Sequence, residues 1–191
     1  MGIKGHPWRA LDQLKILKLN PINIVELGSG SSTGIFAKYV NENQDRSLLS
    51  VDESEVWASL TKKALTKFGA SFNNKVQIKV SKKVEDKDGS SYEMELPDQI
   101  DLLYIDGPTL KREGRKKFPN LDIIKLFRKN VFPKIIMIDG RIDTVNLILS
   151  STQRKKYKYI ANSLLMLKYK MHKTQIIHFG KYHRHSIFIL K

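Results

Sequence analysis

Two glycines follow an acidic residue in the stretch Val25-Glu26-Leu27-Gly28-Ser29-Gly30, where a short apolar run gives way to small residues. Glycine permits the tight turn and close backbone approach that a bound ligand requires, and a helix that begins after such a turn exposes its first amide groups. A carboxylate two positions before the first glycine would repel a pyrophosphate. The same carboxylate suits a ligand that carries an ammonium group and no phosphate, so this segment predicts a cationic cofactor rather than a dinucleotide.

Three further acidic residues stand directly after apolar runs of the kind that form buried strands: Asp52, Asp106 and Asp139. Asp52 lies 24 residues beyond Gly28, and this spacing places it to accept both hydroxyls of a ribose. Asp106 and Asp139 each follow a longer apolar run. We expect these two carboxylates to face one pocket, because the carboxyl ends of parallel strands meet at one edge of a sheet.

The elements that must position these residues follow from the apolar periodicity, which alternates between strands and helices without an internal repeat. The expected strands span 22–27, 48–51, 76–80, 100–105 and 135–138, and the expected helices span 8–19, 33–40, 56–68, 121–130 and 145–149. Segments 174–179 and 186–190 are close enough to form a terminal hairpin. This order predicts an α/β fold with a doubly wound, mostly parallel seven-stranded sheet that ends in an antiparallel hairpin.

Two of the expected helices carry apolar stripes that indicate a buried face. In the helix of 8–19 the stripe contains Trp8, Leu11, Leu14 and Leu17. In the helix of 56–68 the residues of the stripe are Val56, Trp57, Leu60, Ala64, Leu65 and Phe68. We expect the helix of 8–19 to form a lid or an oligomer contact.

The 191-residue chain contains no cysteine, which excludes disulfides, thiolate metal sites and cysteine nucleophiles. Its apolar runs are far shorter than the ~20 residues of a membrane span. The first residues, Met1–Pro7, lack an apolar signal core, so we expect a cytoplasmic protein with no membrane partner. The length fits one domain, with a helical extension at 1–21 followed by a cofactor-binding domain at 22–191.

The formal net charge of +15 leaves two interpretations open. An acidic partner such as nucleic acid would explain it. Alternatively, the excess reflects lysines scattered over nearly every segment without forming a binding face. The second interpretation is favoured, because no nucleic-acid-binding motif accompanies the charge.

The pattern of 24–30, two hydrophobic residues, an acid, a hydrophobic residue and Gly-x-Gly, resembles the first motif of class I S-adenosylmethionine-dependent methyltransferases. Asp52 matches the acid that this family places after its second strand, and Ile105-Asp106-Gly107-Pro108 is similar to a segment of subfamilies that act on sugars and other small hydroxyl acceptors. The resemblance covers 22–191 and implies a Rossmann-like fold, S-adenosylmethionine as cofactor and O-methylation of a small or saccharide hydroxyl. The cofactor-binding residues that it implies are Glu26, Gly28, Ser29, Gly30, Ser32, Asp52, Glu53 and Asp106.

Within this resemblance Glu26 holds the amino-acid part of the cofactor, and Asp106 and Asp139 are the expected catalytic residues that orient or deprotonate the acceptor hydroxyl. In catechol-type relatives the corresponding strand ends hold magnesium, but Gly140 stands where a third ligand is expected. Two alternatives stay open. Either Asp106 and Asp139 hold Mg²⁺ with water, or Asp106 caps the following turn and Asp139 pairs with Arg141.

A basic loop follows Asp106, with five cations within 111–117. Lys111, Arg112 and Arg115, together with Arg141, are expected to bind an anionic acceptor such as a uronate, a phosphate or an acidic glycan, and a solvated surface loop is the alternative.

The three histidines near the end, His178, His183 and His185, have no partner at a metal-ligand spacing and predict no metal site.

Two other functions fit the same fold. One is an RNA methyltransferase, which the overall charge suggests. The other is a non-catalytic nucleotide-binding or interaction module.

Overall fold

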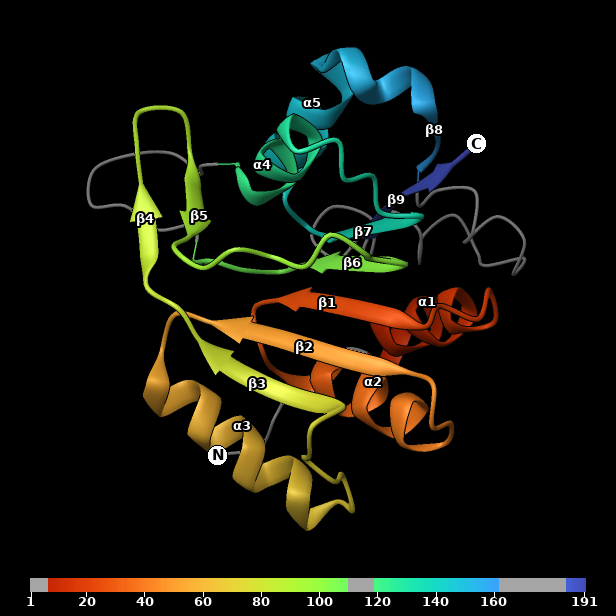
Figure 1. Cartoon of the computed structure of the whole chain (residues 1–191), viewed down its shortest axis with the longest axis vertical. Coiled ribbons are helices and arrows are strands. Elements are labelled where there is room, and N and C mark those ends of the chain that lie inside the picture. The colour runs from red at the N-terminus through yellow and green to blue at the C-terminus, as the bar shows by residue number, and fades with distance from the viewer. Residues whose placement is uncertain (1–6, 110–118, 162–184) are drawn as a thin grey trace, which may run out of the picture.

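The predicted apolar runs lie side by side as strands of one sheet with helices on both faces (Figure 1). The structure is a computed structural model that describes residues 7–109, 119–161 and 185–191. The strands are β1 (Asn23–Leu27), β2 (Ser47–Asp52), β3 (Val76–Val80), β4 (Lys83–Glu85), β5 (Ser90–Tyr92), β6 (Leu102–Ile105), β7 (Ile135–Asp139), β8 (Tyr157–Ala161) and β9 (His185–Leu190). The helices are α1 (Pro7–Leu17), α2 (Ser31–Asn41), α3 (Glu55–Lys67), α4 (Asp122–Arg128), α5 (Ile142–Ser150) and the 3₁₀ helix η1 (Thr152–Lys156).

Seven of the described strands form the main sheet in the order β3-β2-β1-β6-β7-β9-β8. The pairs from β3 to β7 are parallel, and β9 runs antiparallel to both of its neighbours. This confirms the predicted Rossmann-like, mostly parallel sheet with an antiparallel pair near its C-terminal end. The chain order reverses between β1 and β6, which is the point where doubly wound sheets bind ligands.

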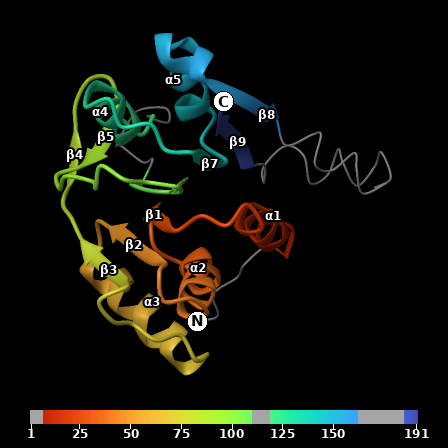
Figure 2. The same cartoon turned by 45° about the vertical axis from the view of Figure 1, so that its right-hand side comes forward.

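Two apolar clusters hold α1 and α2 to one face of the sheet and α4 and α5 to the other. Figure 2 shows where these four helices lie. On one face, Ile24 and Met137 of the sheet pack with the inner residues of α1 and α2. On the other face, Val25 and Ile136 pack with α4 and α5. Adjacent residues of one strand point to opposite faces of the sheet. Because both faces are buried, the sequences of the central strands are continuous apolar runs.

One of the two predicted hairpin segments, 186–190, forms a strand of the antiparallel pair as β9. The partner of β9 is β8, which pairs with it from Tyr157 against Leu190 to Ala161 against Ser186. The expected strand at 174–179 lies outside the described residues. Within the charged connection 81–97, β4 and β5 form a separate antiparallel pair that the sequence pattern did not indicate.

The buried face of α1 differs in part from the predicted stripe. Leu17 is buried as predicted, but Leu11 and Leu14 are exposed, and Gln13 and Ile16 are buried in addition. A polar residue therefore faces the interior of the protein, and its contact lies in the candidate site described below.

The buried face of α3 also differs in part from the prediction. Leu65 is buried as predicted and Ala58 is buried in addition, whereas four residues of the predicted stripe are exposed: Val56, Trp57, Leu60 and Phe68. Leu65 contacts α2. A Cβ atom at Gly34 would lie 2.7 Å from Cδ2 of Leu65, so the glycine makes room for that side chain.

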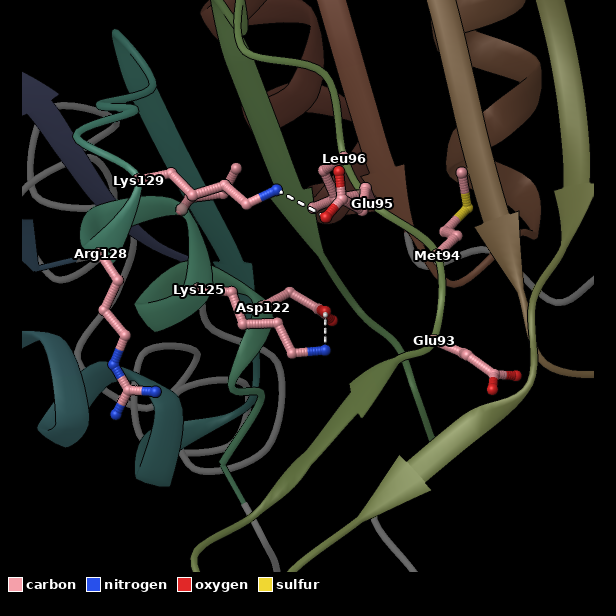
Figure 3. A pocket seen from close by; sticks show the side chains of 9 residues that line it. Glu93, Met94, Glu95, Leu96, Asp122, Lys125, Arg128 and Lys129 are labelled. Atoms are coloured by element: carbon pink, nitrogen blue, oxygen red, sulfur yellow. Dashed lines mark ion pairs between the residues drawn. The ribbon is translucent and has the colours of Figure 1, made fainter.

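A cavity of about 360 Å³ lies between the segment that follows β5 and α4 (Figure 3). An ion pair of 3.0 Å between Lys129 and Glu95 crosses it, and Lys125 lies 3.8 Å from Asp122. None of the predicted site residues lines this cavity.

Among the residues that the structure describes, no helix combines the length and the apolar character needed to cross a membrane.

Candidate functional site

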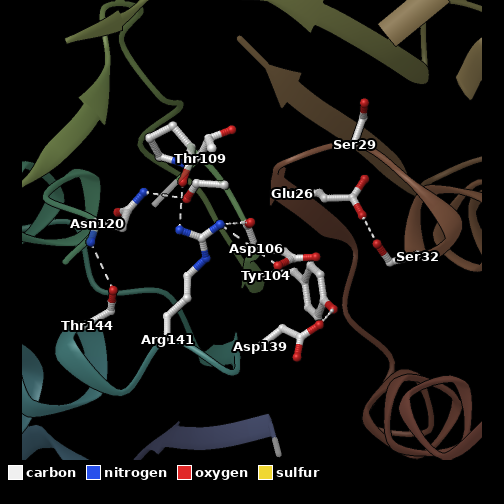
Figure 4. A network of polar contacts seen from close by, with 12 residues as sticks. Glu26, Ser29, Ser32, Tyr104, Asp106, Thr109, Asn120, Asp139, Arg141 and Thr144 are labelled. Carbon is white, nitrogen blue, oxygen red and sulfur yellow. Dashed lines mark hydrogen bonds and ion pairs between the residues drawn. The ribbon is translucent and has the colours of Figure 1, made fainter. Parts of the chain in front are cut away.

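The four central strands end at one edge of the sheet, and this edge carries the predicted site residues (Figure 4). Leu27 of β1 is in register with Val51 on one side and with Ile105 on the other, and Ile105 is in register with Ile138. The residues that follow these four positions therefore lie near one another, as the sequence predicts.

Gly28, directly after β1, lies against the backbone of the loop that follows β6. Its φ of +95° is a conformation that favours glycine, and a Cβ atom there would lie 2.7 Å from the backbone nitrogen of Gly107. Gly30 is different, because a Cβ atom on it would meet nothing within 4 Å. The fold thus requires glycine at position 28, whereas the space beside Gly30 is open.

Ser29, between the two glycines, is tied to the end of β2. Its backbone N–H donates to Oδ2 of Asp52 at 2.9 Å, and its hydroxyl donates to the same oxygen at 2.6 Å. The other oxygen of Asp52 accepts from the backbone N–H of Ser54 at 2.9 Å, and Nε1 of Trp57 donates to the carbonyl of Ser29 at 2.9 Å. Asp52 therefore fixes the glycine turn against β2 while it lines the adjacent cavity.

That cavity, which we call the larger cavity, has a volume of about 550 Å³ and lies outside the ends of β1, β2 and β6. The residues that line it are Gly28, Ser29, Asp52, Glu53, Ser54, Trp57, Asp106, Gly107, Thr109 and Arg141. Glu53 closes its rim, because one carboxylate oxygen accepts from the backbone N–H of Thr109 at 2.8 Å and the other from the hydroxyl of Tyr92 at 3.2 Å.

Glu26 has no exposed surface. Its carboxylate accepts hydrogen bonds from the hydroxyls of Ser32 at 2.5 Å, Thr33 at 2.6 Å and Ser50 at 2.6 Å. Burial raises the pKa of Glu26 to about 7, although the three hydroxyls lower it. The side chain therefore points to the start of α2 (Figure 4) and does not line either cavity of the site. Direct contact with a cofactor stays a prediction that this geometry does not favour.

The raised pKa of Glu26 predicts a pH-dependent stability. The unfolded carboxyl titrates near 4.5 and the folded one near 7, so its contribution is fully present below pH 4.5 and is lost as the pH rises through 7. The difference corresponds to roughly 3 kcal/mol of unfolding free energy. We expect Glu26→Gln to flatten the stability profile between pH 5 and pH 8 in urea unfolding, and Glu42→Gln, at an exposed position, to keep it. Equal pH slopes for wild type and Glu26→Gln would contradict this account.

Asp106 and Asp139 line one smaller cavity of about 160 Å³, between the glycine turn and α1. The Asp106 side chain is 44% exposed, whereas that of Asp139 is 1% exposed. Partial burial and then the charge of Asp139 raise the pKa of Asp106 to about 6. Because Asp106 also lines the larger cavity, it stands where the two cavities meet.

Asp139 pairs with Arg9 of α1 and not with Arg141, the partner considered in the metal-free alternative. Nη1 of Arg9 lies 2.6 Å from Oδ2 of Asp139, while Oδ1 of Asp139 is buried without a hydrogen-bond partner. Arg141 is buried and donates to the carbonyl of Pro108 at 2.7 Å and to the carbonyl of Asp106 (Figure 4). Its guanidinium thus holds the loop after β6 and lines the larger cavity.

The other predicted acceptor-binding residues, Lys111, Arg112 and Arg115, lie outside the described residues, as do His178 and His183. No group of three or more histidine, aspartate or glutamate side chains in the described part of the chain could hold a metal ion. Since the Arg9 guanidinium already neutralises Asp139, the donors at this edge do not fit Mg²⁺.

The sequence analysis did not predict four residues of the smaller cavity and its wall: Arg9, Gln13, Tyr104 and His185. Gln13 donates to the Tyr104 hydroxyl at 3.2 Å, and that hydroxyl lies 3.3 Å from both Asp139 and His185. The polar residues of α1 at spacings of three and four could have indicated a polar buried face.

Comparisons with solved structures agree with this architecture. An O-methyltransferase candidate from Klebsiella pneumoniae matches with a TM-score of 0.63 and 11% identity, over 100% of this chain and 83% of that one. The Bacillus cereus O-methyltransferase in complex with SAH matches with a TM-score of 0.61 and 13% identity, over 100% and 84%. An rRNA-methylase candidate from Clostridium thermocellum matches with a TM-score of 0.56 and 14% identity, over 100% of both chains.

No protein-family model and no curated protein sequence matches the chain. At these identities the structural likeness establishes the fold. The chain has the Rossmann-like fold of class I S-adenosylmethionine-dependent methyltransferases, as its sequence motifs indicate.

Proposed function

We propose that the protein is an S-adenosylmethionine-dependent methyltransferase that methylates a hydroxyl of a small or saccharide acceptor. The observation that carries this proposal is the acidic character of the two cavities beside the glycine turn. Four carboxylates line them, those of Asp52, Glu53, Asp106 and Asp139. Such a site favours a cation over a ligand with phosphates.

Two cationic side chains also line these cavities and offset part of the negative charge. Arg9 pairs with Asp139 at 2.6 Å, and Arg141 donates to backbone carbonyls of the loop after β6 and lies 3.9 Å from Oδ1 of Asp106. Asp52 and Glu53 then carry most of the preference for a cation. Neither guanidinium is arranged to receive a phosphate. The open space beside Gly30 further supports a ligand that approaches the backbone there.

In this proposal different residues bind different parts of the cofactor. Asp52 would accept hydrogen bonds from the ribose, Glu53 would lie near the adenine edge, and Asp106 would face the ammonium and sulfonium charges. The backbone at Gly28, Ser29 and Gly30 would allow close approach, with Ser32 beside it. When bound, S-adenosylmethionine supplies a methyl group activated by its sulfonium.

Glu26 has a different task in this proposal. It holds the start of α2 through the hydroxyls of Ser32 and Thr33 and β2 through the hydroxyl of Ser50, and it thereby shapes the glycine turn, so we assign it to positioning. We assign 1–21 to a helical extension, whose helix α1 contributes Arg9, Ala10 and Gln13 to the smaller cavity, and 22–191 to the cofactor-binding domain.

Asp106 and Asp139 would orient the acceptor hydroxyl and receive its proton. Alignment of two bound reactants can contribute ~7–11 kcal/mol, so positioning is the main contribution of the protein. The cations of 111–117 would favour an anionic acceptor.

The test is methyl transfer from radiolabelled S-adenosylmethionine to a panel of neutral sugars, uronate-containing glycans and RNA. We expect label on a hydroxyl acceptor and not on RNA. Loss of a charged hydrogen-bond acceptor costs ~1.5–3 kcal/mol, so Asp52→Asn should raise the KM for the cofactor ~10–100-fold. Asp98→Asn, at an exposed position before β6, is the matched control.

Each contrary outcome identifies another function. Label on RNA alone, with a rate that falls steeply as salt rises, would establish the RNA methyltransferase. Cofactor binding without transfer to any member of the panel would favour the non-catalytic module.

A further inference from the structure

A continuous row of polar side chains runs behind the smaller cavity, from α1 through the sheet. Nδ1 of His185 on β9 lies 3.1 Å from Oδ2 of Asp12 on α1. Nε2 of His185 lies 3.3 Å from the hydroxyl of Tyr104 on β6, and that hydroxyl lies 3.3 Å from Oδ2 of Asp139 on β7. Figure 4 shows the Tyr104 end of this row beside Asp139.

The donors and acceptors in this row have a defined direction. The Asp12 carboxylate can only accept, so Nδ1 of His185 carries a hydrogen. In the neutral ring Nε2 is then an acceptor that faces the Tyr104 hydroxyl. Because Gln13 donates to the Tyr104 oxygen, the single hydroxyl hydrogen of Tyr104 can point to His185 or to Asp139. Tyr104 therefore connects the cavity to a histidine whose side chain has no exposed surface.

We propose that Tyr104, His185 and Asp12 form a buried proton relay that receives the proton released when an acceptor hydroxyl is methylated. This inference rests on the proposed function. As the O–CH₃ bond forms and the S–CH₃ bond breaks, the acceptor O–H bond also breaks and its proton enters at the Asp106–Asp139 pair. Tyr104 takes the proton that Asp139 holds and gives its own hydroxyl proton to Nε2 of His185.

Only His185 ends this step with an added proton, and the Asp12 carboxylate balances the charge of the imidazolium. His185, Tyr104 and Asp12 act through Asp139, so they are positioning residues. Within the described residues, the other charged groups near this row are Arg9 from α1, Asp106 from the end of β6 and Glu26 from β1. The relay resembles the orientation of a histidine base by a buried aspartate.

The relay can be tested without knowing the acceptor. S-adenosylmethionine carries the sulfonium charge and SAH does not, so SAH should leave the acidic cluster with more protons. Calorimetric titration of both ligands at pH 6.5, in phosphate and in Tris, gives the number of protons taken up. We expect SAH binding to take up at least about half a proton more than S-adenosylmethionine binding, because the relay can accept a proton once the sulfonium charge is absent.

His185→Gln should abolish this proton difference while both ligands still bind. Asp12→Asn keeps the histidine but removes its counter-charge, and it should at least halve the difference. An undiminished difference in either folded variant would overturn the relay, because Asp106 or Glu26 would then hold the proton. If both ligands bind to wild type with equal proton uptake, the relay is overturned while the proposed function stands. Failure of both ligands to bind would overturn the proposed function and the relay with it.

Tyr104→Phe supplies a second readout in the transfer assay. It should lower kcat at least ~10-fold, within the range that proton transfer contributes, and leave the KM for the cofactor unchanged. Tyr157→Phe is the matched control, because the Tyr157 hydroxyl is buried without a hydrogen-bond partner and lies outside the row. Equal kcat values for the two variants would contradict the role of Tyr104.

Discussion

Gly30→Val abolishes measurable cofactor binding while the protein stays folded; this is the largest effect that we expect from a single substitution. At Gly30 a side chain would project into open space that no atom of the fold fills. The backbone φ of 170° is extended and accessible to any residue, so the fold gives no reason for glycine here. If that space is where the cofactor meets the backbone, three added carbon atoms occupy it.

The expected loss of affinity for SAH is ~100-fold or more, which corresponds to ~2.8 kcal/mol, and calorimetry measures it. Gly30 precedes the first residue of α2, and the loss of stability from an altered helix cap is about 1 kcal/mol.

Gly28→Ala is the informative comparison, because it should lower the free energy of unfolding, whereas Gly30→Val should mainly lower the affinity for the cofactor. Its positive φ costs a non-glycine residue ~1–3 kcal/mol, and the new methyl group would press on the backbone of Gly107. We expect urea unfolding to show a large loss for Gly28→Ala and a small one for Gly30→Val. Unchanged SAH affinity in folded Gly30→Val would refute the placement of the cofactor.

Arg9→Met should destabilise the protein by ~2–3 kcal/mol at pH 7. The substitution leaves the buried Asp139 carboxylate without its cationic partner, and removing one member of a buried ion pair is strongly destabilising. The Arg9 side chain is partly exposed, so the effect lies below that of a fully buried pair. Methionine retains the length and the apolar packing of the arginine stem.

A double-mutant cycle separates the ion pair from the packing of α1. In Arg9→Met combined with Asp139→Asn, no buried charge is left unpaired, and most of the lost stability should return. Urea unfolding of the four proteins measures the coupling. Strictly additive losses would show that Arg9 does not stabilise Asp139.

The ends of the central strands could be predicted from sequence because each strand is buried on both faces. A strand such as Ile135–Asp139 then reads as an uninterrupted apolar run, and the polar residue at its end marks the edge of the sheet. The convergence of Asp106 and Asp139 on one cavity follows from this topology alone. β8 escaped prediction because Lys158 interrupts its apolar residues, and its pairing with β9 depends on distant sequence.

The wall formed by α1 could not be predicted from sequence spacing. Gln13 and Tyr104 are 91 residues apart, and Asp12 and His185 are 173 apart. The apolar stripe of α1 predicted its buried face only in part, because periodicity measures hydrophobicity and these contacts are polar. Only the packed structure shows that α1 presents Arg9, Asp12 and Gln13 to the site.

The most direct measurement is a calorimetric comparison of three nucleoside ligands on the wild-type protein: SAH, ATP and NAD. The acidic cavities beside the glycine turn predict that SAH binds in one-to-one stoichiometry and that ATP and NAD, which carry phosphates, produce no heat of binding. Binding of ATP or NAD in preference to SAH would contradict the account.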